Sequence, residues 1–224
     1  DLKGTRAELV EAEAKIGNLP TGKEAAWRRL IALYQQIGAL TWTEEAIIKA
    51  KLEKDPVAVQ IAQTRARYGV PRGSKFVAPE QEALLVVAIR RALDQVYATK
   101  YGEAEATLAA AEKQWPGAPG LAGARCDLAL RMGQFGPARA SCNRALAADP
   151  DASWALYLSG VLALRDASGT KAGIAKLKRA IAVDPELAQA WRTLAKAYGR
   201  TNDKAALAQL ATDYQAKFGQ PLPQ

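Results

Sequence analysis

The chain has 224 residues, a formal net charge of +8, two cysteines and no histidine. This length can bury the core of one domain or two, and many alanines with few β-branched or aromatic runs favour helices over sheet. Without histidine the chain lacks the usual general base at neutral pH and the commonest metal ligand. The cysteines form no CxxC pair, and no glycine-rich phosphate loop occurs. We therefore expect no enzyme, no metal and no cofactor. The longest apolar run, residues 83–89, is too short to span a membrane.

The N-terminal part, residues 1–56, has the periodicity of amphipathic helices. Three helices are expected there: residues 5–16, 24–37 and 43–54. Gly17 and Pro20 end the first, and Asp55-Pro56 is expected to end the third, because proline cannot continue a helix.

A basic connection, residues 57–79, follows. Its first half can be helical, whereas its glycines and proline predict a loop from Gly69 to Phe76. Four cations lie in this segment: Arg65, Arg67, Arg72 and Lys75. They could form a contact loop for another molecule, but isolated basic loop residues are ordinary, so we favour a solvated connection between two helical blocks.

The remainder, residues 80–224, contains internal repeats. Similar segments end at Pro116, Pro150 and Pro185, which are 34 and 35 residues apart. This period is that of a helix-turn-helix unit, in which proline stops the second helix. Within one unit, Gly160 and Gly173 are the small residues expected to let two helices approach closely.

These repeats resemble the tetratricopeptide repeat (TPR) family. Ala190-Trp191 with Leu194, Ala195 and Tyr198 is similar to the family's first-helix pattern, and the segment from Tyr101 to Pro116 is similar to its second-helix pattern. Four units begin near Leu85, Pro119, Ser153 and Ala188. The RNA-reading pentatricopeptide repeat has a similar period, but the small residues and terminal prolines look like TPR. Residues 24–56 resemble a degenerate repeat, since Trp27 and Tyr34 match and the second helix does not. The resemblance implies an all-α, right-handed α-solenoid of antiparallel helix pairs.

In TPR proteins the first helices of successive units line a concave groove. The resemblance places thirteen residues at groove positions: Asp127, Leu130, Arg131, Trp154, Tyr157, Val161, Leu164, Arg165, Gln189, Arg192, Lys196, Gly199 and Arg200. Five are cationic and one is acidic, so a peptide that carries carboxylates would suit this surface. The alternatives are that the charges are solvated helix charges and that the aromatic side chains pack between repeats.

A scaffold or adaptor that binds an acidic peptide or protein is therefore the leading hypothesis. One alternative is a structural component of a bacterial cell-envelope complex that acts by self-association or anchoring. Another, less favoured, is nucleic-acid binding through the basic connection.

The two cysteines bear on the cellular compartment. Cys126 and Cys142 are expected on antiparallel helices at comparable distances from the turn at Gly133 to Gly136, where small residues let the backbones approach. A disulfide would imply an oxidising compartment such as a periplasm, whereas two core thiols would fit the cytosol. The chain begins at Asp1 rather than methionine, which suggests an upstream boundary or a removed signal or anchor segment. We favour the disulfide and a periplasmic or envelope-associated protein.

Overall fold

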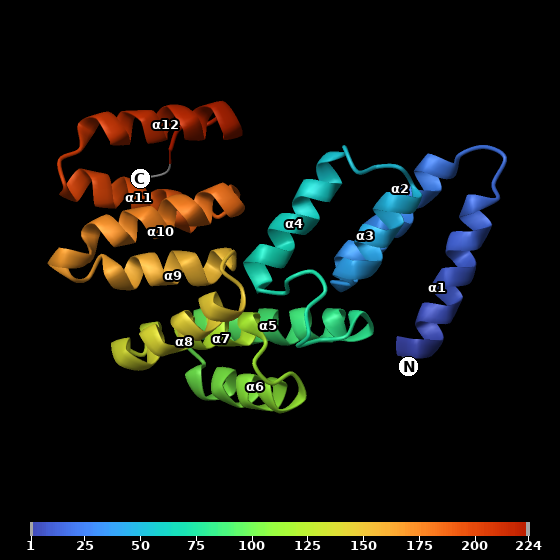
Figure 1. Cartoon of the computed structure of the whole chain (residues 1–224), viewed down its shortest axis with the longest axis horizontal. Helices are drawn as coiled ribbons and strands as arrows, with labels where there is room; N and C mark the ends of the chain where they lie inside the picture. The colour runs from blue at the N-terminus through green and yellow to red at the C-terminus, as the bar shows by residue number, and fades with distance from the viewer. Residues whose placement is uncertain (1, 223–224) are drawn as a thin grey trace. The chain divides into compact units, whose positions relative to one another are not determined.

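The structure, a computed structural model, describes residues 2–222 and leaves aside the side chains of residues 2–5 and 167. Residues 1, 223 and 224, at the ends of the expected 1–56 and 80–224 domains, lie outside the described residues. Within residues 2–222 the chain forms twelve α-helices and two short 3₁₀-helices, with no strand (Figure 1). The all-α expectation is confirmed. In this range no helix is both long and apolar enough to cross a membrane.

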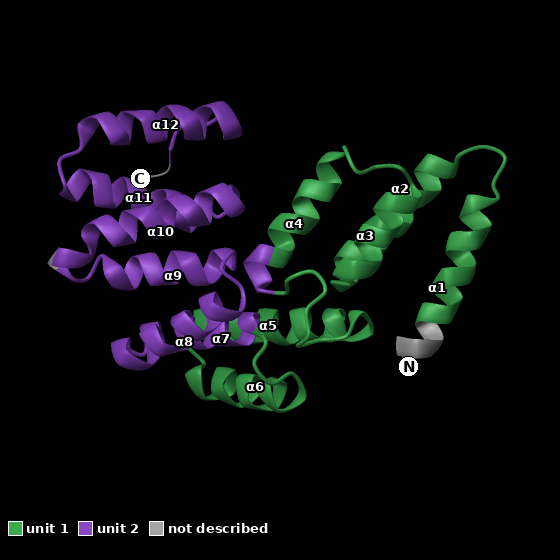
Figure 2. Ribbon diagram, in the orientation of Figure 1, with its two compact units in different colours: residues 1–65, 70–118 green, residues 66–69, 119–224 purple. Residues whose placement is uncertain are grey.

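The chain divides into two compact units (Figure 2). Unit 1 comprises residues 1–65 and 70–118, and unit 2 comprises residues 66–69 and 119–224. The domain limits expected at residues 56 and 79 stay predictions.

Unit 1 contains the N-terminal helices and one further helix pair. Its elements are α1 (Leu2–Gly17), α2 (Lys23–Ile37), α3 (Leu40–Lys49), α4 (Pro56–Tyr68) as far as Arg65, η1 (Pro79–Gln81), α5 (Glu82–Tyr97) and α6 (Tyr101–Gln114). Helix α2 buries Trp27, Leu30, Ile31 and Tyr34 against α3 at the helical spacing seen in the sequence. Helices α5 and α6 pack together, and α5 also contacts α3.

Helix α3 lies earlier in the chain than predicted. It spans Leu40–Lys49 instead of residues 43–54. Lys51 adopts a left-handed backbone conformation (φ 57°), and the Leu52 N–H donates to the Ile47 carbonyl, which closes the helix end. Pro56 starts α4 rather than ending α3, because proline suits the first turn of a helix, where no N–H is needed.

Among the described residues, three charged side chains are buried in unit 1, Glu13, Arg65 and Glu82, and each is paired within the unit. Glu13 is 4% exposed and accepts hydrogen bonds from the Tyr34 hydroxyl (2.7 Å), from Arg6 (2.9 Å) and from Lys49.

Arg65, the second of them, is 5% exposed. It forms ion pairs of 3.0 Å with Glu44 and with Glu82, and it donates to the Val70 carbonyl (2.9 Å). The expectation of a solvated basic connection is therefore wrong for Arg65, because two carboxylates distant in sequence are brought to it by the fold.

Unit 2 is built from three successive helix pairs. They are α7 (Pro119–Arg131) with α8 (Phe135–Ala148), α9 (Ser153–Ala163) with α10 (Thr170–Val183), and α11 (Ala188–Arg200) with α12 (Lys204–Phe218); the 3₁₀-helix η2 (Ala167–Gly169) precedes α10. Each pair packs on the next through α8 with α9 and α10 with α11. The first helices also contact one another directly, α7 with α9 and α9 with α11. They therefore form one layer of the stack.

Small residues set the spacing of α9 and α10, as the sequence predicts. A Cβ on Gly160 would lie 2.9 Å from Leu177 Cγ, and one on Gly173 would lie 2.8 Å from Leu164 Cγ. These distances are too short for real Cβ contacts, so the approach depends on glycine at both positions.

A disulfide and a buried ion pair connect elements of unit 2. Cys126 of α7 and Cys142 of α8 are joined in a disulfide, with 5.2 Å between their Cα atoms and both side chains fully buried. Asp184, directly after α10, is also fully buried and accepts two hydrogen bonds from Arg67, at 2.7 and 2.8 Å. Arg67 belongs to the short segment 66–69 that forms part of this unit.

Candidate functional site: a cationic cleft between α9 and α11

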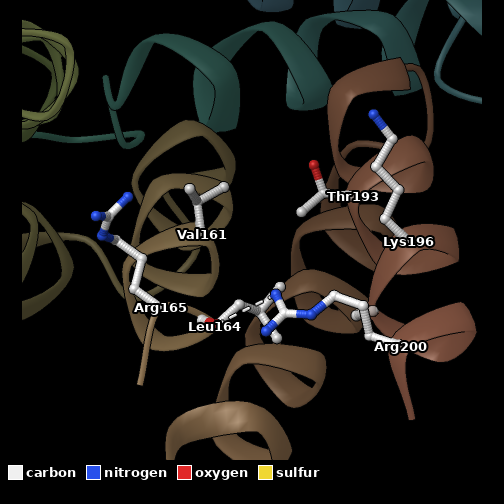
Figure 3. A pocket seen from close by; sticks show the side chains of 7 residues that line it. Val161, Leu164, Arg165, Thr193, Lys196 and Arg200 are labelled. Carbon is white, nitrogen blue, oxygen red and sulfur yellow. Dashed lines mark hydrogen bonds between the residues drawn. The ribbon is translucent and has the colours of Figure 1, made fainter. Parts of the chain in front are cut away.

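A cleft of about 480 Å³ lies between α9 and α11 of unit 2. It is lined by Val161, Leu164, Arg165, Thr193, Lys196, Ala197 and Arg200 (Figure 3). Leu164 and Ala197 are buried, so the cleft has an apolar floor beneath polar walls. Val161 lies in the last turn of α9, and Leu164 and Arg165 follow directly after the helix ends at Ala163. Positions 193, 196, 197 and 200 share one face of α11, as spacings of three and four residues require.

The three cations of the cleft have no carboxylate partner among the described residues. Arg165, Lys196 and Arg200 come from both walls, and no acidic side chain lines the space. Since the attraction between unlike charges is not already satisfied within the chain, the cleft can stabilise an added anion.

The cationic groups are spread out rather than gathered at one point. The Arg165 guanidinium lies 3.8 Å from the centre of the Phe135 ring. Arg200 reaches from α11 to α9, where its Nη1 donates to the Leu164 carbonyl at 3.5 Å. In Figure 3 the Arg165 and Lys196 side chains lie on opposite sides of the cleft, and the Arg200 side chain extends across it toward Leu164. The arrangement therefore suits several carboxylates along an extended chain better than one compact anion.

The structure brings only some of the expected groove residues into this cleft. Arg192 is exposed but does not line it. Asp127 and Arg131 pair with each other one helical turn apart, at 2.9 Å, on α7. Trp154 and Tyr157 lie near the start of α9, with ring centres 5.2 Å apart. Trp154 is buried and Tyr157 is half-buried, so the packing alternative holds for the tryptophan.

Burial dominates the electrostatics around Asp127. It raises the pKa of this carboxyl above its ordinary value, and the charge of Arg131, together with hydrogen bonds from Arg131 and from the Trp154 indole, offsets only part of that effect. Burial likewise raises the pKa of the Tyr157 phenol. A hydrogen bond with the Thr193 side chain acts in the opposite direction and lowers this pKa. Thr193, the partner of the Tyr157 side chain, is also one of the residues that line the cleft.

Sequence reasoning missed Thr193 as a cleft residue. It lies three residues before Lys196, a spacing that places both on one helix face and could have identified it.

The other features of the described residues favour no chemical site. No group of His, Cys, Asp and Glu in residues 2–222 could hold a metal ion. A larger cleft of about 690 Å³ in unit 1 contains Glu13 and Lys49, which already bond to each other. The cationic cleft therefore remains the best candidate.

No protein-family model matches the chain, and no curated protein is similar enough to count as a relative. Function has to be inferred from the geometry of the cleft and from the repeats.

Proposed function

We propose that this chain is a TPR-type, right-handed α-solenoid scaffold that binds an extended acidic peptide of another protein in the cleft between α9 and α11. The observation that carries the proposal is the set of three cations, Arg165, Lys196 and Arg200, that line one cleft and have no carboxylate partner in the part of the chain that the structure describes. The prolines 34 and 35 residues apart and the direct contacts among α7, α9 and α11 support the repeat assignment.

The cleft suits a peptide with mixed side chains. Carboxylates would pair with the cations on its walls, and an apolar side chain would cover Leu164 and Ala197 on its floor. Exposed ion pairs contribute little singly, so affinity would depend on several pairs together with this apolar contact. Binding without covalent chemistry is the proposed activity.

The charges of the basic connection support a peptide partner over nucleic acid. Arg65 pairs with Glu44 and Glu82, and Arg67 pairs with Asp184. Arg72 also pairs with Glu44. These arginines pair with carboxylates of the chain, whereas the cations of the cleft have no carboxylate partner among residues 2–222.

The disulfide supports an oxidising compartment, such as a periplasm or the outside of the cell. Disulfides persist there and are rare in the cytosol. We therefore infer that the chain meets its acidic partner in such a compartment.

The experiment measures binding of a fluorescein-labelled, glutamate-rich decapeptide by anisotropy. The double variant Lys196→Glu/Arg200→Glu should bind at least about tenfold more weakly, which corresponds to roughly 1.4 kcal/mol. The matched control is Lys204→Glu/Lys217→Glu on α12, which changes the net charge equally at exposed positions outside the cleft. Equal loss in both variants, or equal binding of a lysine-rich decapeptide, would show that the cleft is not the site.

A further inference from the structure

A second pocket of unit 2 lies among α10, α11 and α12. Its volume is about 240 Å³, and it shares no lining residue with the cationic cleft. Helix α11 packs against both α10 and α12 and lies between them (Figure 1). The residues of α11 therefore form the floor of the pocket, and those of α10 and α12 form its two walls.

The floor of this pocket is apolar and aromatic. Trp191, Leu194 and Tyr198 lie on one face of α11 at spacings of three and four residues, and all three are buried. Ile181 of α10 and Leu210 of α12 continue the apolar surface onto the walls. The Trp191 indole N–H already donates to a backbone carbonyl at 2.7 Å, so the ring needs no polar partner from a ligand. The pocket therefore suits an apolar side chain.

The two walls carry one charge of each sign. Lys178 lies on α10, three residues before Ile181, and Asp213 lies on α12, three residues after Leu210. Both are exposed, and no ion pair joins either of them to an opposite charge among residues 2–222. Asp213 accepts a hydrogen bond from the neutral Gln209 side chain at 2.8 Å. Two opposite charges therefore line one apolar pocket without neutralising each other.

This arrangement is complementary to a zwitterion with an apolar side chain. A carboxylate would pair with Lys178, and an ammonium group would pair with Asp213. A ligand with a single charge would leave one of these residues without a partner. The volume limits the side chain, because an apolar cavity of about 150 Å³ holds a benzene ring, and the rest of this pocket leaves room for a head group but not for a long chain.

We propose that this pocket binds a free apolar α-amino acid, such as phenylalanine or leucine. Its side chain would lie on Trp191 and Leu194, and its head group would lie between Lys178 and Asp213. Binding involves no covalent step. The site is separate from the peptide cleft, so the chain would hold a small ligand as well as a protein partner.

The test is an NMR titration of the ¹⁵N-labelled chain with L-phenylalanine, which measures both affinity and location. The Trp191 indole N–H resonance should shift. L-alanine, which lacks the ring, should bind at least about tenfold more weakly, because the buried ring supplies most of the apolar contact. Phenylpropanoate lacks the ammonium group and phenylethylamine lacks the carboxylate. Each should bind about two- to fivefold more weakly, since an exposed ion pair contributes little singly.

Two variants at exposed positions assign the charges. Lys178→Gln should weaken phenylalanine about two- to fivefold and leave phenylethylamine unchanged. Asp213→Asn should weaken phenylalanine to a similar extent and leave phenylpropanoate unchanged. The matched control is Lys171→Gln, at an exposed lysine of α10 that does not line the pocket, and it should bind phenylalanine as the unaltered chain does.

Four results would overturn this site. They are no binding of either phenylalanine or leucine, equal binding of alanine, equal binding of N-acetyl-phenylalanine amide, which carries neither charge, and equal affinities of all three variants. None of them would affect the proposed peptide binding, which is measured with a different probe and with substitutions on a different face of α11.

Discussion

The buried charges of unit 1 and the cleft cations of unit 2 differ in the partners that the fold gives them. In unit 1, Glu13 and Arg65 are buried, and their hydrogen bonds and ion pairs are formed with residues of the same unit. In unit 2, Arg165, Lys196 and Arg200 line an open cleft and have no carboxylate partner among the described residues. The presence of a basic residue therefore predicts little by itself. A basic residue that the fold places beside a carboxylate stabilises the structure. A basic residue without such a partner is available to bind another molecule.

The largest expected effect is loss of the Arg65 network in unit 1. Arg65→Met should lower the free energy of unfolding by about 3–5 kcal/mol, because Glu82, itself 2% exposed, would be left buried without its cation. Urea denaturation followed by circular dichroism measures the change.

The matched control for Arg65 is Arg72→Ala, since both arginines pair with Glu44 and the Arg72 side chain is 72% exposed. This substitution should cost no more than about 1 kcal/mol. If the two variants lose equal stability, Arg65 is not the structural centre of unit 1.

The disulfide of unit 2 should contribute the next largest effect. The two cysteines are 16 residues apart. Closing a loop of that size stabilises a folded chain by about 3 kcal/mol in the chain-entropy description. The variant Cys126→Ala/Cys142→Ala should lose about this amount in urea denaturation. A reducing agent should destabilise the unaltered chain and leave the variant unchanged; equal responses would contradict a stabilising disulfide.

The smallest expected effect is on the pH dependence of the free energy of unfolding. Two of the buried carboxyls, Glu13 and Asp127, should contribute to it with opposite signs. Burial raises the pKa of Glu13, but hydrogen bonds from Lys49, Tyr34 and Arg6 outweigh it, so the pKa is lowered overall. Its stabilisation is present above the pKa of an unfolded glutamate and is lost as pH falls through the folded value. The pKa of Asp127 is raised, so its ionised form destabilises the fold and stability recovers as pH falls through that value.

Unfolding free energies measured from about pH 3 to about pH 7 test these signs, because ordinary carboxyl pKa values lie within that range. Glu13→Gln should flatten the loss of stability toward acid. Asp127→Asn should raise stability most at the neutral end. Slopes that change in the same direction in both variants would contradict the assigned signs.

Much of the fold was predictable because its signals are local. Proline after Asp149 and Asp184 indicates where α8 and α10 end, and Gly133 at φ 74° supplies the turn after α7. The end of α3 was missed because its left-handed residue is Lys51 rather than the usual glycine or asparagine. No composition signal marks such a position.

The candidate site was predictable in part, through the resemblance. It placed Arg165, Lys196 and Arg200 at groove positions, and the structure finds all three at one cleft. It could not show that Asp127 is buried, nor that Arg192 lies off the cleft. These properties depend on side-chain packing among three helices, which spacing along one helix does not determine.

The ion pair of Arg67 and Asp184 has a consequence for dividing this chain into fragments. Its partners are 117 residues apart in sequence, although both belong to unit 2. A fragment that starts at Pro119 would keep the three helix pairs α7 to α12 of unit 2 and lose the guanidinium that neutralises a fully buried carboxylate. During synthesis, the same pair cannot close until residue 184 has been made, long after α7 and α8 can pair locally. A truncation at Pro119, although it follows a helix boundary, should therefore destabilise unit 2.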